Sequence, residues 1–317
     1  MALRTLPFSL VDVFANEPLA GNGLSVFLLD EELPTPLMQR ITQEMRQFET
    51  IFLRRLDRPF AFAARIFTME EELAFAGHPV IGAAAWLHAE QFGERDEVPF
   101  ELVLRDRSVG VTSRRDGAAY FAQMDQGVAT FEPPIPVDKW PGLLQALNLG
   151  SADLAPGLPL QVVSTGLPYL IVPIRSNLHS VRIGVSNFEA LLATVGAKFA
   201  YIFDIERREG RTWDNDGRVE DIATGSAAGP TAAYLVRHGL AASGEPQVLA
   251  QGRFLHRPSA LHARVTGDSE LRVQVGGRVC LVGGGALRLP DEWLVGQGLN
   301  ATPPADQTHP AAHPPEN

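Results

Sequence analysis

Two stretches of small and apolar residues stand out in the pattern of hydrophobic and polar positions. The later one, Glu220–Leu235, reads E-D-I-A-T-G-S-A-A-G-P-T-A-A-Y-L, with acids and hydroxyls before a glycine and mostly small residues after it. Thr224 or Ser226 can accept a hydrogen bond from the first free N–H groups of a helix, and the alanines favour its continuation. Because such a helix has no charged face, we predict that it is buried at the centre of a domain.

The earlier stretch repeats the later one at an offset of 148 positions. This offset places Glu72 on Glu220, Gly77 on Gly225 and His78 on Ser226. A weaker match joins the segments that begin at Ala20 and at Ser164. A repeat of this length predicts two related halves, each built around one apolar helix.

The segments around these helices alternate, or carry β-branched and aromatic residues, as strands do. We expect strands over 8–14, 24–29, 51–54, 60–68, 101–104, 109–112, 119–123, 160–163, 169–172 and 200–204, and helices over 79–91, 140–147 and 188–195. A further amphipathic helix is predicted from Thr35 to near Phe48–Thr50. Gly276-Gly277, between two apolar runs, is predicted to be a two-residue hairpin turn.

The length of 317 residues predicts two domains of ordinary size. The proline-rich segment Gln126–Val137 lacks periodicity and is the expected crossing between them. We expect an N-terminal domain over 1–128, completed by part of 283–298, and a C-terminal domain over 129–282. Residues 301–317 are rich in proline, alanine and polar side chains and are expected to form a disordered tail.

Composition and charge exclude several classes of protein. The chain is 45% hydrophobic and 20% charged, as globular proteins are. Its net charge of -10, without a basic block, argues against nucleic acid as a partner. Asp12 interrupts the N-terminal apolar run before a signal-peptide core is complete, and we expect a cytoplasmic protein without a membrane partner. The single cysteine, Cys280, excludes an internal disulfide and a thiol metal cluster.

His78 and Asp221 lie where the two apolar helices are expected to begin. Pro79 favours an extended conformation at His78 and suits the first helical turn, so we predict His78 at the helix N-cap. It is either a functional residue or a histidine that merely fits there. Asp221 lies near the positive end of the later helix, where it either takes part in chemistry or only complements the helix dipole.

Glu49 is the least conspicuous candidate. It is predicted to end an amphipathic helix, which is the unfavourable end of the dipole for a carboxylate. If Phe48 and Phe52 also remove it from water, it suits a general acid/base. The alternative is an ordinary surface glutamate.

Five motifs follow one another in a specific order. They are V-D-V-F-A-N-E-P-L-A-G-N-G-L-S-V-F from Val11, E-T-I-F-L from Glu49, E-L-A-F-A-G-H-P from Glu72, S-T-G-L-P-Y-L-I-V-P from Ser164 and E-D-I-A-T-G-S-A from Glu220. Together, over about 7–290, they resemble the phenazine biosynthesis PhzF-like isomerase family. The resemblance implies an α+β, diaminopimelate epimerase-like fold. In this fold two similar domains, each a β-barrel-like sheet wrapped round a central helix, enclose an active site between them.

The resemblance also implies an isomerase without cofactor or metal, which moves a proton between carbons of a small, cyclic carboxylate. Glu49 would be the general acid/base, and His78 and Asp221 would orient the substrate and tune protonation. The residues implied in substrate binding are Gly77, Gly225, Ser226, Thr224 and Asn22. Relatives that epimerise with two cysteines have thiols at the positions of Glu49 and Gly225, so two-thiol racemisation is not expected here. A homodimer is implied as well.

Three positions depart from the family's motifs. Phe48 replaces a serine before the glutamate, Gly23 replaces the proline of G-N-P, and Ile222 replaces the proline of D-P-A-T-G. These changes bear on the substrate more than on proton transfer. Two alternatives stay open. One is a ligand-binding or interaction protein that has lost turnover because Phe48 blocks the cleft, and the other is an epimerase in which Glu49 works with another acid.

Overall fold

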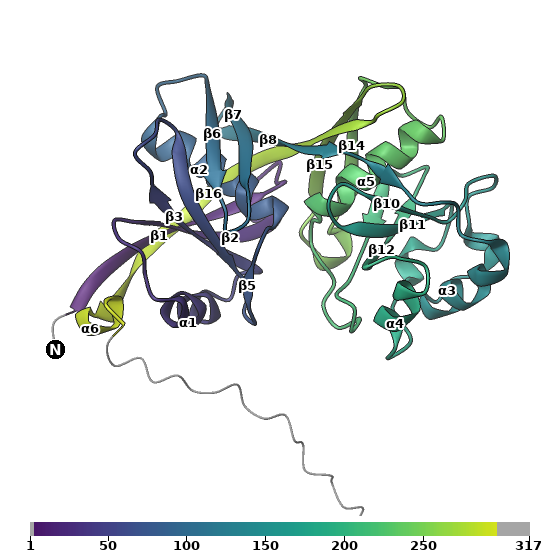
Figure 1. The fold of residues 1–317 in the computed structure, drawn as a ribbon, viewed down its shortest axis with the longest axis horizontal. Helices are drawn as coiled ribbons and strands as arrows, with labels where there is room; N and C mark the ends of the chain where they lie inside the picture. Colours follow the sequence, from purple (N-terminus) through teal and green to yellow (C-terminus); the bar gives the residue numbers. More distant parts are fainter. Residues whose placement is uncertain (1–2, 297–317) are drawn as a thin grey trace, which may run out of the picture.

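One continuous 16-stranded sheet winds around two buried helices, α2 (Gly77–Gln91) and α5 (Gly225–Arg237), as Figure 1 shows. The structure is a computed structural model that describes residues 3–296. The predicted tail over 301–317 and residues 297–298 of the predicted closing segment lie outside the described residues. None of the helices within 3–296 has the length and apolarity needed to cross a membrane.

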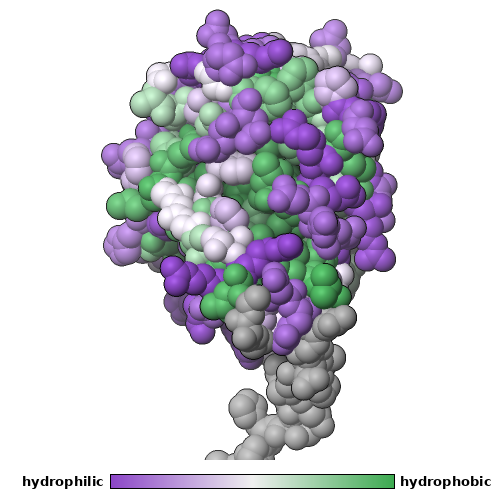
Figure 2. Space-filling model, turned by 90° about the vertical axis from the view of Figure 1, so that its left-hand side faces the viewer, coloured by the Kyte–Doolittle hydropathy of each residue, from purple (hydrophilic) through white to green (hydrophobic). Residues whose placement is uncertain are grey.

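The first half is a closed barrel around α2. Its eight strands, in spatial order, are β1 (Leu3–Val13), β2 (Asn22–Leu29), β3 (Glu49–Arg55), β4 (Ala61–Phe67), β6 (Glu97–Val103), β7 (Ser108–Asp116), β8 (Ala119–Val128) and β16 (Arg272–Pro290). The barrel closes because β16 pairs with both β8 and β1. The short β5 (Glu72–Leu73) pairs with β4 in the antiparallel direction. Polar residues cover much of the outer face of this half, with apolar residues visible between them (Figure 2).

The second half repeats the arrangement around α5. From β16 its strands run, in spatial order, β15 (Ser259–Thr266), β14 (Pro246–Gln251), β13 (Glu209–Arg211), β12 (Phe199–Asp204), β11 (Pro168–Ile174), β10 (Gln161–Ser164) and β9 (Thr130–Phe131). The outer helices of the molecule are α1 (Thr35–Met45), α3 (Trp140–Ala146), α4 (Phe188–Ala193) and α6 (Asp291–Leu294). In Figure 1, α1 and α6 lie beside the first half, and α3 and α4 beside the second.

The strand β16 belongs to both halves, and the predicted hairpin turn at Gly276-Gly277 is wrong. Both glycines lie inside this uninterrupted strand. They are needed for close packing, because a Cβ atom would lie 2.5 Å from Ala122 O at Gly276 and 2.5 Å from the Phe14 ring at Gly277. The strand pairs with β15 near its start and with β1 from Val279 onward. Because one strand thus contributes to both halves, its pairing does not test the predicted domain boundaries at 128/129 and 282/283, which remain a prediction.

Both central helices are buried, as their composition predicts. Every residue of α2 from Gly77 to His88 is buried. The helix begins two residues earlier than expected, and the N-cap position is Ala76, so the predicted N-cap role of His78 is wrong. The small side chains allow the barrel wall to approach the helix closely.

The predicted end of the amphipathic helix at Phe48–Thr50 is also wrong. The helix α1 ends at Met45, because Arg46 adopts a left-handed conformation with φ of 51°. Glu49 is instead the first residue of β3. The glutamate therefore does not lie at a helix C-terminus, and its position depends on the barrel.

The close contact between α2 and the barrel generates a stability prediction. A Cβ atom on Gly82 would lie 2.6 Å from a Leu24 methyl and 2.7 Å from a Val13 methyl, whereas one on Gly142 in α3 would meet no atom within 4 Å. Alanine gains the same helix propensity at both sites. We therefore expect the unfolding free energy of Gly82→Ala to be about 1–3 kcal/mol below that of Gly142→Ala, as measured by urea denaturation. Equal stabilities would contradict this packing.

Candidate active site

The N-termini of α2 and α5 face each other where the two halves meet. A Cβ atom on Gly77 would lie only 3.8 Å from the backbone nitrogen of Ser226. It would also lie 3.2 Å from the Met124 methyl, and one on Gly225 would lie 3.1 Å from the Phe14 ring. The first backbone N–H groups of both helices thus gather in one place. Two positive helix ends with free N–H groups suit the binding of a carboxylate.

Glu49 and His78 form a buried ion pair beside these helix ends. Glu49 Oε2 lies 2.9 Å from His78 Nε2, and each residue is 6% exposed. Glu49 pairs with Leu24 in the parallel β2–β3 ladder. Residues two apart on a strand lie on the same face, so Glu49 points into the barrel as the buried Ile51 does. The predicted alternative of a surface glutamate is therefore wrong. The barrel wall and the start of α2 together hold the pair.

The neighbouring carboxylate sets the charge of His78. Burial alone lowers the pKa of this imidazole, but the charge and hydrogen bonding of Glu49 outweigh burial and raise the pKa, with smaller contributions from Asp221 and the Gly23 carbonyl. The imidazolium form is therefore favoured. Within the described residues, Glu49 Oε2 and His78 Nε2 have no polar partner other than each other.

Asp221 is held by hydrogen bonds to both oxygens. Asn22 Nδ2 donates to Oδ1 at 3.1 Å and Ala223 N–H donates to it at 3.3 Å, while Thr224 Oγ1 donates to Oδ2 at 2.5 Å. Burial raises the pKa of Asp221, against the hydrogen bond from Thr224, and the negative charge of Glu49 raises it further. The carboxylate is fixed in place in a site that already carries one anion.

Asn22 joins the two halves at this cluster, and Thr224 holds Asp221 within the second half. Asn22 Nδ2 also donates to Ala223 O at 3.3 Å, and its Oδ1 is buried without a hydrogen-bond partner among residues 3–296. Thr224 stands at the N-cap of α5, but its hydroxyl donates to Asp221 Oδ2 and accepts from Gln251 Nε2 at 3.0 Å, and makes no capping hydrogen bond. The predicted hydrogen bond from a helix N–H to the Thr224 hydroxyl is therefore wrong. Ser226 lies in the helix and shares a 2.8 Å hydrogen bond with Tyr169 OH.

The structure thus brings together the eight predicted site residues, although their roles remain a prediction. They are Asn22, Glu49, Gly77, His78, Asp221, Thr224, Gly225 and Ser226.

Sequence reasoning missed two side chains that border the site. Gln251 accepts from Thr224 N–H at 3.1 Å and donates to the Asp221 carbonyl at 2.8 Å. Nothing at the end of β14 signals this role. Tyr169 lies within the motif from Ser164 but carries no sign that it contacts Ser226. Burial raises the pKa of Tyr169, so its hydroxyl stays neutral.

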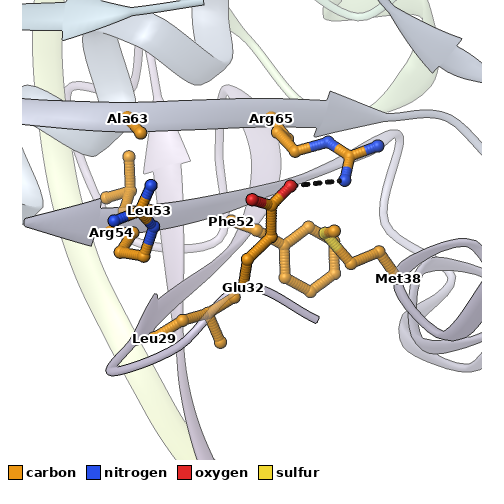
Figure 3. Close-up of a pocket in the computed structure, with 8 residues that line it drawn as sticks. All are labelled: Leu29, Glu32, Met38, Phe52, Leu53, Arg54, Ala63 and Arg65. Atoms are coloured by element: carbon orange, nitrogen blue, oxygen red, sulfur yellow. Dashed lines mark hydrogen bonds and ion pairs between the residues drawn. The ribbon is translucent and has the colours of Figure 1, made fainter. Parts of the chain in front are cut away.

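A hollow on the first half lies apart from this cluster. It is lined by residues of β2, β3, β4, α1 and the loop before α1, as Figure 3 shows. Its acid, Glu32, lies 3.2 Å from Arg65, which Glu72 also binds through two hydrogen bonds. Because these charges are already paired, the hollow does not compete with the Glu49–His78 cluster as a candidate active site.

Comparisons with known proteins cover nearly the whole chain. The family model for phenazine biosynthesis-like proteins matches residues 11–285. The trans-2,3-dihydro-3-hydroxyanthranilate isomerase of Pseudomonas fluorescens is 32% identical over 89% of this chain and 99% of its own length. The structure of a predicted epimerase from Pseudomonas aeruginosa is 50% identical, covers 89% of this chain and 99% of that one, and has a TM-score of 0.82. A PhzF-family structure from Bacillus anthracis is 22% identical, covers 90% and 99%, and has a TM-score of 0.78.

The raised pKa of His78 generates a prediction about stability and pH. A histidine that binds its proton more tightly when folded stabilises the fold fully below about pH 6.5, its unfolded pKa, and loses this contribution as pH rises through the folded pKa. We expect His78→Gln to lower the unfolding free energy by about 3–5 kcal/mol near pH 6, because it leaves Glu49 buried and unpaired. The loss should shrink towards pH 9 in denaturant titrations.

His238 provides a control of opposite sign. Burial, and then the charge of Arg237, lower the pKa of His238. The cost of His238→Gln should therefore grow, not shrink, as pH rises. The same trend for both variants would contradict the charge assigned to His78.

Proposed function

This chain belongs to the phenazine biosynthesis-like protein family and is an isomerase, and we propose that it moves a proton between carbons of a small cyclic carboxylate. In this proposal Glu49 is the general acid/base and no cofactor or metal takes part. The family match confirms the resemblance carried by the motifs, and the solved structures confirm the diaminopimelate epimerase-like fold. A homodimer and a cytoplasmic location, both expected from the sequence, remain part of the proposal.

The buried Glu49 carboxylate, 2.9 Å from His78, carries the proposal. A general base must lie where water does not compete for the proton it transfers, and Glu49 is 6% exposed. Within the described chain its Oε2 atom has no polar partner apart from His78, which leaves room in this proposal for a substrate carbon beside it. Because Glu49 raises the pKa of His78, the pairing favours the imidazolium form, and its charge would stabilise an ionised Glu49 before the proton moves.

The helix ends supply the binding and the electrostatics. A substrate carboxylate would lie against the N–H groups near Gly77, Gly225 and Ser226, which fixes the ring relative to Glu49. When Glu49 removes a proton, negative charge develops on the ring, and the His78 imidazolium and the helix dipoles stabilise it. Glu49 then returns the proton to another ring carbon. Asp221, held by Thr224 and Asn22, orients polar groups of the substrate.

The experiment is proton NMR in heavy water with trans-2,3-dihydro-3-hydroxyanthranilate and related ring acids, since a 32% identical relative is named for that substrate. Wild type should introduce deuterium at a ring carbon, and Glu49→Gln should do so about 10²–10⁴-fold more slowly. Glu101→Gln is the matched control, because Glu101 is a strand glutamate that pairs with the exposed Arg58 outside the site.

The outcomes separate the alternatives. Unchanged exchange in Glu49→Gln would overturn the role of Glu49. A product that differs from the substrate only in chirality would indicate epimerisation. Saturable binding by wild type without any exchange would support a binding protein.

Phe48 generates a second prediction for this site. Its ring precedes Glu49 and is 36% exposed, whereas the family has a serine there. We expect Phe48→Ser to admit larger ring acids. The ratio of kcat/KM between large and small members of the same panel should rise about tenfold, with the unfolding free energy little changed. An unchanged ratio would mean that Phe48 does not border the substrate.

A further inference from the structure

Arg257 lies just before β15 in the second half and binds the β1–β2 loop of the first half. Its Nε donates to Gly21 O at 2.6 Å, and its NH2 group donates to Ala20 O at 2.9 Å and to Asp12 Oδ1 at 2.6 Å. Next to it, Pro258 O accepts from Gly21 N–H at 3.1 Å. One guanidinium therefore binds two carbonyls of the loop and a carboxylate of β1, across the junction of the halves.

The acceptor Asp12 lies near the end of β1, just before the same loop. Its side chain is 8% exposed, and its second oxygen accepts from Leu19 N–H at 2.6 Å. A buried carboxylate needs a charged or hydrogen-bonding partner, and Arg257 supplies the charge. Gly21 has φ of +64°, and a Cβ atom there would lie 2.3 Å from Val13 O, so the loop is tightly folded where Arg257 binds it.

The loop leads directly into the site. The residue after Gly21 is Asn22, whose amide donates to Asp221 Oδ1 at 3.1 Å. The segment that carries Arg257 also supports Asp221 from the other side. Gln251 Nε2 donates to the Asp221 carbonyl at 2.8 Å, and a Cβ atom on Gly252 would lie 2.6 Å from Ile222 O. One short segment thus holds both partners of the Asn22–Asp221 hydrogen bond.

We propose that Arg257 is a positioning residue that holds Asn22 against Asp221 and so keeps the two halves of the site in register. It does not touch the substrate but acts through the Gly21 and Ala20 carbonyls and the Asp12 carboxylate. The catalytic part of this inference rests on the proposed function. Arginine suits the task because its planar, forked donors reach several acceptors at once, whereas the single ammonium of lysine does not match them all.

The test compares Arg257→Gln and Arg257→Lys with the matched control Arg272→Gln. Arg272 also binds a carboxylate at 2.6 Å, that of Asp125, but both side chains are about half exposed. The first readout is hydrogen exchange of the Gly21 and Leu19 amides in the unliganded protein. We expect exchange to be about tenfold faster or more in Arg257→Gln, intermediate in Arg257→Lys and unchanged in Arg272→Gln.

The second readout is turnover in heavy water with trans-2,3-dihydro-3-hydroxyanthranilate. Arg257→Gln should lower kcat/KM about 10–100-fold. The share of this loss that comes from kcat, and the share that comes from KM, should be the same as in Asn22→Ala. Because both changes act on one hydrogen bond, the double variant should be no slower than Asn22→Ala alone. Multiplied losses in the double variant would overturn the inference, as would amide exchange unchanged by Arg257→Gln.

Failure of the proposed function would look different. If wild type shows no turnover but the Gly21 amide exchanges faster in Arg257→Gln, the proposed reaction is overturned and the hold of Arg257 on the Asn22 loop is supported. If the amide exchanges faster while turnover stays unchanged, the positioning role is overturned.

Discussion

Two helix N-termini that meet in a buried space impose the main electrostatic constraint on this fold. Each end carries partial positive charge, and the His78 imidazolium adds to it. Glu49 and Asp221 bring two carboxylates to the same place, from a strand of one half and from the segment before α5 in the other. Glu49 pairs with His78 within the first half, whereas Asp221 of the second half accepts a hydrogen bond from Asn22 of the first, so the contact between the halves is part of the site's structure.

Small residues make this meeting possible. Gly77 and Gly225 begin the two helices, and larger side chains there would collide with Met124, Phe14 or the opposite helix. The strand β16 joins the halves behind the helices, and its glycines let the barrel wall approach Phe14 and β8. The low charge of the central helices thus reflects packing, and the site's polarity comes from the residues around their first turns.

The sequence was sufficient to predict the two buried helices and the repeat, and the family resemblance named a set of residues that the structure brings together. These depend on composition and on motifs that are local to each segment. It failed where pairing between distant segments overrides local preference. Gly276-Gly277 has the composition of a turn, but neighbours on both edges extend the strand through it. The burial of Glu49 and the contacts of Gln251 come from strand positions that no local pattern marks.

The departures from the family's motifs change the surroundings of Glu49 but not its pairing with His78. The His78 imidazolium receives support from the Gly23 carbonyl, which a proline at this position would also supply, so this change leaves the acid/base pair intact. The absence of the proline ring also changes the packing near Gln47. Any Cβ atom at position 23 would collide with the Gln47 amide oxygen. Gln47 and Phe48 directly precede Glu49 in the chain. The glycine at position 23 therefore leaves room for the Gln47 side chain, two residues before Glu49, while the His78 partner of the glutamate stays the same.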